Sequence, residues 1–182
     1  MEFVSRLIVS IIHISRGCHF PIEQDPFSIF FLLYAKKVGI LKNMDLERLA
    51  FWSDKNTNYG DNILLELYGK FQNVTQLSVS DNYAYRSLVI MLNNIDDKLY
   101  QKYYCDLIEG LISHLAQQSG MASAEFCQPK AITRLAGELV KRINPRFIYN
   151  PFAGLCSYAL ISSKYKYYGQ EKDTGINLLA RV

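Results

Sequence analysis

The residues best suited to chemistry lie in the last third of the chain, in three short segments. The first is 126–129, Phe-Cys-Gln-Pro, and the second is 150–157, Asn-Pro-Phe-Ala-Gly-Leu-Cys-Ser. The third is 168–171, Tyr-Gly-Gln-Glu, which ends in a carboxylate. Gly154, in the second segment, lets the backbone approach a ligand closely. Backbone amides and a carboxylate bind the polar parts of nucleotides, so the three segments predict the first half of a nucleotide-type cofactor pocket.

Such a pocket requires parallel strands behind it. Residues 146–149 are aromatic and β-branched with proline on both sides, and residues 164–168 alternate as in a strand. Helices are predicted over 156–163 and 173–182. The order strand, helix, strand, helix is typical of the start of a doubly wound parallel sheet, which binds ligands at the carboxyl edge of its strands.

At that edge, the amides of residues 155–157 are expected to face acceptor atoms of a ligand. Glu171 is expected to accept hydrogen bonds from both hydroxyls of a ribose. Simpler explanations stand beside each signal. One glycine most often marks a turn, and an isolated glutamate is a solvated acid. Gln128 before Pro129 also describes a plain helix start, with the proline in the first helical position.

The first two thirds of the chain predict helices separated by polar turns. An opening helix has Phe3, Leu7, Ile8, Ile11 and Ile12 at helical spacing, and the periodicity is clearest over about 97–118. Further helix starts are predicted at Asp25-Pro26, Asp45, Asp61 and Ser80 or Asp81, and one more helix over 129–143.

In the helix that starts at Asp25-Pro26, Phe27, Phe30, Phe31, Tyr34 and Val38 are expected to share one face, with Gly39 as the stop. The apolar positions of the helix over 97–118 are expected to be packed core: Tyr100, Tyr103, Tyr104, Leu107, Ile108, Leu111, Ile112 and Leu115. We therefore predict a mainly α protein with two domains: a helical bundle over 1–119, and the truncated start of an α/β, Rossmann-like sheet over 120–182.

Composition narrows the class of protein. The net charge of +3 is too small to indicate nucleic-acid binding. The four cysteines lie far apart, with no histidine at ligand spacing, which argues against a metal site or a disulfide framework. The apolar run at the start is short and is broken by Ser10 and His13, so it predicts neither a signal peptide nor a membrane span. A cytoplasmic protein is expected.

Taken in order, the three segments resemble the N-6 adenine-specific DNA methyltransferases, in particular the methylation subunits of type I restriction-modification systems. That family has a helical amino-terminal domain, then F-x-T-P, a D-P-x-x-G-x-G-type turn, and a strand ending in G-x-E. The specific resemblance covers about 107–182, whereas the helical domain fits by class and order only. The tail 177–181, Asn-Leu-Leu-Ala-Arg, is similar to the family's helix after the acid.

The resemblance implies an S-adenosylmethionine site in this crevice. The F-x-T-P segment and the glycine turn would hold the methionine end, and Glu171 the ribose. A later N-P-P-[FY] loop would grip the flipped-out adenine. The cofactor residues implied are Phe126, Gln128, Pro129, Asn150, Phe152, Gly154, Cys156 and Glu171.

The sequence departs from the family at four points. Gln128 replaces the threonine, Asn150 the acid and Cys156 the second glycine. These changes are expected to weaken or abolish cofactor binding, at roughly 1–3 kcal/mol per broken polar contact. No Asn-Pro-Pro sequence occurs, so no catalytic residue is assigned. We expect a fragment, or the product of a shortened gene, that is inactive alone.

Two alternatives remain. In one, the helical domain is a protein–protein interaction module of a restriction-modification complex that docks a specificity subunit or a second copy, without binding the cofactor. In the other, the protein is all-helical and the motif matches are chance. DNA would be a partner only in the context of the full protein. Self-association is also expected, because a two-stranded sheet leaves edges and an apolar face uncovered.

Overall fold

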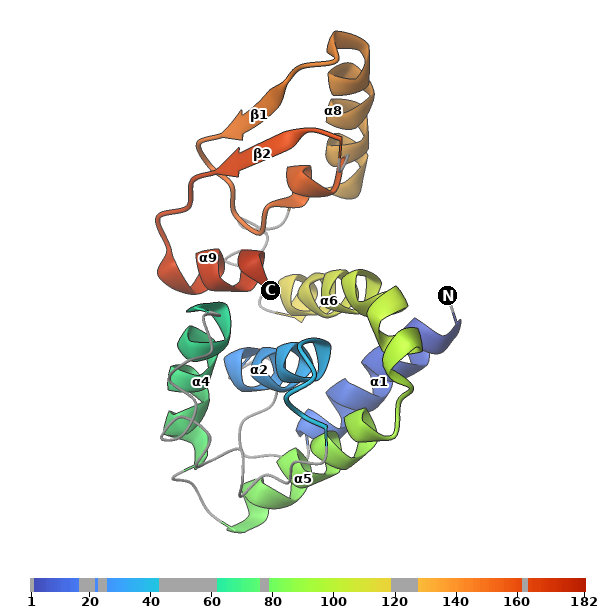
Figure 1. The fold of residues 1–182 in the computed structure, drawn as a ribbon, viewed down its shortest axis with the longest axis vertical. Helices are drawn as coiled ribbons and strands as arrows, with labels where there is room; N and C mark the ends of the chain where they lie inside the picture. The colour runs from blue at the N-terminus through green and yellow to red at the C-terminus, as the bar shows by residue number, and fades with distance from the viewer. Residues whose placement is uncertain are drawn as a thin grey trace. The chain divides into compact units, whose positions relative to one another are not determined.

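The computed structural model describes residues 2–16, 22, 26–42, 62–75, 79–118, 128–161 and 164–182. In these residues the protein is mainly helical, with one small parallel sheet of two strands (Figure 1). The chain divides into two compact units, residues 1–115 together with Val182, and residues 116–181. No helix among the described residues has the length and apolar character that crossing a bilayer requires.

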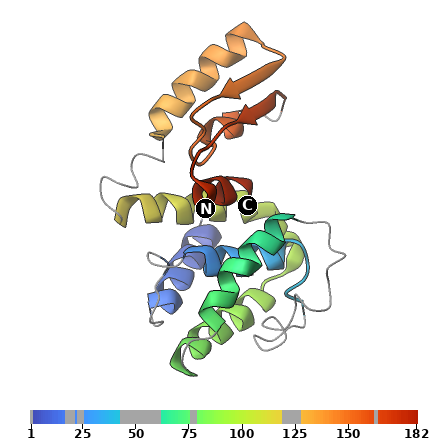
Figure 2. The same cartoon turned by 90° about the vertical axis from the view of Figure 1, so that its left-hand side faces the viewer.

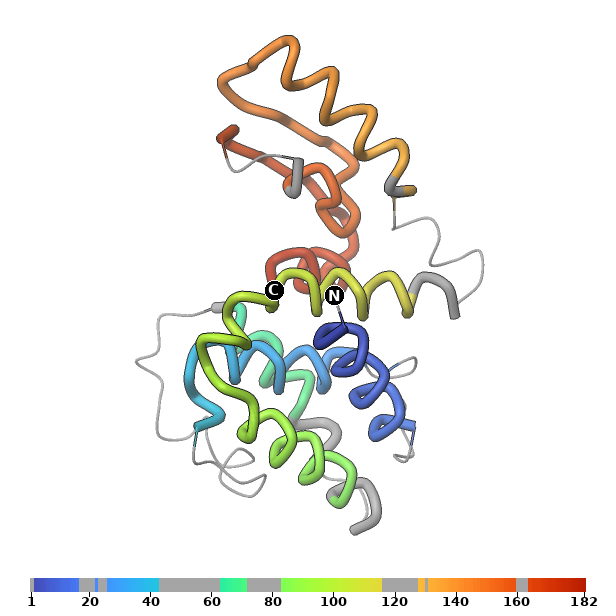
Figure 3. The backbone as a smooth tube through the Cα atoms, turned by 90° about the vertical axis from the view of Figure 1, so that its right-hand side faces the viewer, coloured from blue at the N-terminus to red at the C-terminus, as the bar shows by residue number. Residues whose placement is uncertain are grey.

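The first unit is a helical bundle with α2 at its centre. Its helices are α1 (Glu2–Arg16), α2 (Pro26–Lys37), α4 (Asn62–Thr75), α5 (Val79–Asn93) and α6 (Asp97–Gln118), of which α6 belongs to this unit up to Leu115. Helix α2 packs against α4 and α5, and α1 also packs against α5 (Figure 1). The chain changes direction between α5 and α6, as the tube in Figure 3 shows.

Helix α2 is buried on all sides over Ser28–Lys36. The predicted face is buried at Phe30, Phe31 and Tyr34, and the burial extends to the other sides of the helix as well. The physical reason is that its sequence is apolar around the whole circumference, which is typical of a central helix rather than a surface one. Gly39 follows with φ +80°, and the amides of Ile40 and Leu41 donate back to the Ala35 carbonyl, so the predicted stop is confirmed.

The core of this unit is aromatic. The Phe31 ring centroid lies 4.7 Å from that of Phe71 and 5.5 Å from that of Tyr68. On α6, Tyr100 is 1% exposed and donates its hydroxyl hydrogen to the Leu33 carbonyl oxygen at 3.0 Å, which joins α6 to α2. The predicted apolar side of α6 is confirmed as core at Tyr100, Tyr104, Leu107, Ile108 and Leu111.

The predicted helix start at Ser80 or Asp81 differs from the structure. Ser80 and Asp81 lie inside α5, which begins at Val79, so neither is the residue before its first turn. The short helix expected after Asp45 lies outside the described residues, as do Asp25 and Asp61.

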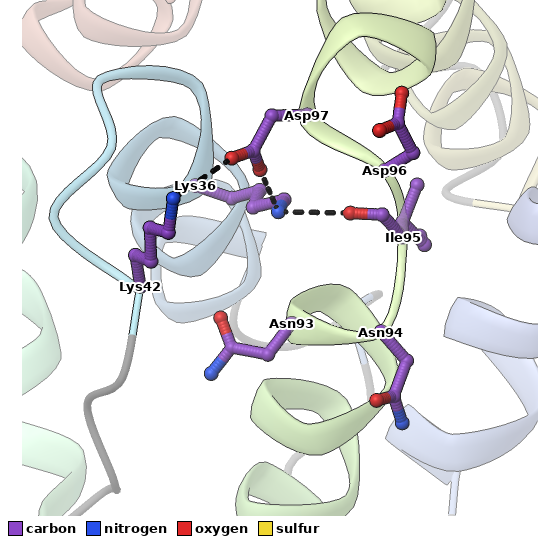
Figure 4. A pocket seen from close by; sticks show the side chains of 7 residues that line it. All are labelled: Lys36, Lys42, Asn93, Asn94, Ile95, Asp96 and Asp97. Carbon is purple, nitrogen blue, oxygen red and sulfur yellow. Dashed lines mark hydrogen bonds and ion pairs between the residues drawn. The ribbon is translucent and has the colours of Figure 1, made fainter.

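A buried lysine holds the reversal between α5 and α6. Lys36 is 6% exposed, and its ammonium donates to the Ile95 carbonyl oxygen at 3.0 Å and to the Asp97 carboxylate. Lys42 Nζ lies 3.8 Å from Asp97 Oδ2. Figure 4 shows these side chains around an open hollow of about 420 Å³, which Asn93 also lines. In this hollow the Asp97 carboxylate is paired with two cations, Lys36 and Lys42, an arrangement that fixes the turn.

Acid is expected to weaken the interaction of Asp97 with Lys36 and Lys42. The hydrogen bond from Lys36, followed by its charge, holds the pKa of the Asp97 carboxyl below its usual 3.8. A lowered pKa in the folded state means that the stabilisation is complete above the unfolded-state pKa and disappears as the pH falls through the folded-state pKa. Urea unfolding at neutral pH and at about pH 3 should show Asp97→Asn less stable than the parent at neutral pH, with a smaller gap in acid.

The control for this experiment is Asp106→Asn, which changes an exposed acid on the same helix. The stability of Asp106→Asn in urea should differ little from that of the parent protein at both pH values. An Asp97→Asn variant with the same acid sensitivity as the parent would contradict the assignment.

The second unit contains the sheet. It comprises α8 (Lys130–Ile143), β1 (Phe147–Asn150), the 3₁₀ helix η2 (Ser157–Ile161), β2 (Lys166–Gly169) and α9 (Thr174–Arg181). Strands β1 and β2 are parallel, and their register runs from Phe147 opposite Lys166 to Asn150 opposite Gly169. Helix α8 lies alongside the sheet and contacts η2 (Figures 1 and 2). The predicted strands and the predicted last helix are confirmed within one or two residues.

Two details of this unit differ from the prediction. The helix expected over 156–163 is a short 3₁₀ turn, in which the Ala159 amide donates to the Cys156 carbonyl three residues back. Pro129 is the N-cap of α8 rather than its first helical residue. Its ψ of 132° is extended, and its carbonyl accepts the amides of Ile132 and Thr133.

Candidate functional site

The two turns that leave the carboxyl edge of the sheet lie side by side. Asn150 and Gly169 end their strands as register partners. Beyond them, the Gln170 amide donates to the Asn150 carbonyl at 2.9 Å, and the Ala153 amide donates to the Gln170 carbonyl at 2.8 Å. Because parallel strands end at one edge, these two bonds hold the glycine turn against the segment that carries Glu171.

The Glu171 carboxylate is fixed by backbone amides from both turns. Its Oε2 accepts the Gly154 N–H at 2.9 Å, and its Oε1 accepts the Asp173 N–H at 2.9 Å. The side chain is half-buried. A carboxylate has about four acceptor positions, so each oxygen keeps capacity for one further donor. The arrangement presents two oriented acceptors beside an amide-lined bend.

Asn150 shapes the turn from the other strand. Its Oδ1 accepts the Phe152 N–H at 3.0 Å, which closes an Asx turn, and its Nδ2 donates to the Tyr167 hydroxyl oxygen at 3.2 Å. An aspartate at this position would also close the turn, but it would have no hydrogen to donate to Tyr167. Asn150 is therefore a structural residue of the turn in its own right.

Cys156 adopts a backbone conformation that favours glycine. Its φ is +56°, close to the +52° of Gly154, and for a side chain with a Cβ this left-handed region is strained by roughly 1–2 kcal/mol. The thiol lies beside the Tyr167 hydroxyl, and the two groups influence each other's pKa. Burial raises the pKa of this thiol, with its interaction with Tyr167 acting in the opposite direction, so the sulfur stays protonated at neutral pH.

The other predicted site residues are placed differently. Phe152 is 88% exposed, and Gln128 and Pro129 precede α8. Within the described part of the chain, neither Gln128 nor Pro129 makes a hydrogen bond to the glycine turn or to Glu171. Phe126 lies outside the described residues. The structure therefore brings together Asn150, Gly154, Cys156 and Glu171.

Two residues of this site were not among the predicted cofactor residues. Tyr167 accepts a hydrogen bond from Asn150 and lies beside Cys156. Gly169, which is part of the third predicted segment, provides the close approach of the two turns. A Cβ added at Gly169 would lie 2.9 Å from the Ala153 Cβ and 3.3 Å from Cys156 Sγ. In the sequence, a glycine at the end of an aromatic strand is the feature that could have indicated this close approach of two backbone segments.

The site presents carboxylate acceptors and backbone amides that can recognise a polar ligand. Free acceptors on Glu171 suit hydroxyl donors such as those of a ribose, and the neighbouring backbone suits a polar ligand. Across the described ranges, no group of three His, Cys, Asp or Glu side chains is arranged to hold a metal ion. Comparison with known proteins gave no match to a family model, a curated protein or a solved structure.

Proposed function

We propose that the second unit is the cofactor-binding start of an S-adenosylmethionine-dependent adenine DNA methyltransferase of the restriction-modification type. The observation that carries this proposal is the Glu171 carboxylate, held by the Gly154 and Asp173 amides at the carboxyl edge of two parallel strands. The order of the three sequence segments supports the same assignment. DNA and a specificity subunit are the corresponding partners in the complete enzyme.

The residues of the edge fit the cofactor in part. Glu171 retains acceptors for both ribose hydroxyls, and the left-handed conformations at Gly154 and Cys156 suit a glycine-type turn. The cofactor would supply an activated methyl group for the exocyclic amine of adenine. The role of this chain would be to bind and orient it, because the 182 residues contain no Asn-Pro-Pro segment to grip the base. We expect no methyl transfer from them alone.

Calorimetry of the whole chain with S-adenosylmethionine tests the proposal. Binding in the micromolar range is expected, and Glu171→Gln should weaken it about 10- to 100-fold, the range for a hydrogen bond to a charged group. Glu138→Gln is the matched control, since Glu138 is an exposed acid on α8 paired with Lys141. The control should bind as the parent does.

Cys156→Gly provides a change in the opposite direction. It removes the strain of a left-handed non-glycine residue and restores the family's glycine, so tighter binding by about fivefold is expected. Absent or millimolar binding by the parent, or equal effects of the two glutamate variants, would overturn the cofactor assignment.

The alternative is the interaction module without cofactor binding. It is favoured by the large apolar side chains that both units expose, more of them in the second unit, since a partner chain would cover them. The exposed side chains of the second unit are Ile132, Leu135, Leu139, Ile143, Phe147, Tyr149, Phe152 and Tyr168. Failure of the calorimetric test, with the helical unit still folded, would support this reading.

A further inference from the structure

One face of the sheet carries three aromatic side chains and a lysine. Phe147 and Tyr149 alternate on β1, and their register partners on β2 are Lys166 and Tyr168. Register partners in a sheet lie on the same face. Phe147, Tyr149 and Tyr168 are 60%, 57% and 55% exposed. We call these four residues the aromatic face. Parallel sheets are normally covered on both faces, so the exposure of the aromatic face is unusual.

The rings of the aromatic face are held in place. The Phe147 and Tyr168 rings meet edge to face, with centroids 6.2 Å apart and an interplanar angle of 81°. The Tyr149 hydroxyl donates to Gln170 Oε1 at 2.8 Å. Fixed rings lose little conformational freedom when a flat ligand stacks on them, which favours binding.

Charge is distributed unevenly along the chain. The second unit, residues 116–181, contains nine Lys or Arg against four Asp or Glu, a net +5, whereas the whole chain carries +3. Lys166 lies on the aromatic face itself, and the exposed Arg146 and Lys164 lie close in sequence to its strands. The net charge of the whole chain hides this concentration of positive charge in the second unit. The excess of Lys and Arg there indicates an anionic ligand for that unit.

A second copy of the chain is a poor occupant of this face. Three aromatic side chains at this exposure offer about 260–430 Å² together, since each buries about 150–250 Å² when fully covered. A stable interface needs about 800 Å² per partner. Two such faces would also bring together two units of net +5.

We propose that the aromatic face binds single-stranded nucleic acid. Bases would stack on Phe147, Tyr149 and Tyr168, and Lys166 would contact the phosphate backbone. Stacking needs unpaired bases, so a duplex is bound only through its charge. This surface does not depend on the cofactor edge, and its failure would leave the proposed function untouched.

Fluorescence anisotropy of the whole chain with labelled oligothymidine, oligouridine and a DNA hairpin tests the proposal at low salt. Tighter binding of either single strand than of the hairpin is expected. Comparison of thymidine with uridine identifies DNA or RNA as the preferred strand. Phe147→Ala and Tyr168→Ala should each weaken single-strand binding about 5- to 150-fold. Lys166→Gln should lower the salt slope by about 0.7.

Three controls keep the experiment decisive. Tyr83→Ala removes a tyrosine of α5 that is 75% exposed and outside the face, and it should bind as the parent does. Tyr168→Phe keeps the ring and should retain binding. Phe147→Leu keeps apolar bulk without the ring and should lose it. Absence of binding, or an equal loss of binding in Tyr83→Ala, would overturn the proposal. It would also be overturned if sedimentation showed a dimer that Phe147→Ala converts to monomers.

Discussion

Phe31→Ala is expected to lower the free energy of unfolding of the helical unit by about 3–5 kcal/mol. Phe31 is fully buried on the central helix α2, with its ring against those of Phe71 and Tyr68. Truncation leaves a cavity at the point where α2 and α4 pack. Since a domain is stable by only about 5–15 kcal/mol, much of the unit's stability depends on this one ring.

Urea unfolding followed by far-UV circular dichroism measures this effect. Phe152→Ala is the matched control, because it makes the same chemical change at a side chain that is 88% exposed. Its effect should stay within about 0.5 kcal/mol. Similar losses in the two variants would show that the described core is wrong.

Gly169→Ala is expected to destabilise the second unit by about 1–3 kcal/mol, the usual cost of overpacking. The new Cβ would lie 2.9 Å from the Ala153 Cβ and 3.0 Å from Tyr167 Cε1. Ala153 cannot withdraw easily, because it is buried and its amide donates to the Gln170 carbonyl. The two turns would have to separate, which would also displace Glu171 from Gly154.

Hydrogen exchange of the amides of β1 and β2 reports the stability of this unit directly. Gly69→Ala on α4 is the control, since a Cβ at Gly69 meets nothing within 4 Å. An alanine in a helix interior should stabilise by about 0.5–1 kcal/mol, so the two identical substitutions have opposite expected signs. Adding Ala153→Gly should restore part of the loss in Gly169→Ala. Absence of this rescue would contradict the described contact.

The sequence predicted those parts of the fold that depend on period and order. Helix α6 follows from its regular apolar spacing. The closeness of Gly154 and Glu171 follows from strand order, because the turns after two parallel strands share an edge. The burial of α2 on all sides could not be predicted from the sequence, since apolar residues on every side leave no periodicity that distinguishes one face.

Side-chain partnerships within the site were beyond sequence reasoning. The hydrogen bond from Asn150 to Tyr167 and the closeness of Tyr167 to Cys156 depend on which face each residue takes at the strand ends. The left-handed Cys156 also could not be foreseen, because cysteine has no preference for that conformation.

The double use of the Asn150 amide has a consequence for engineering the turn. Aspartate at position 150 would keep the Asx turn closed but would leave the Tyr167 hydroxyl oxygen without its donor. A carboxylate at this position is therefore best introduced together with a change at Tyr167.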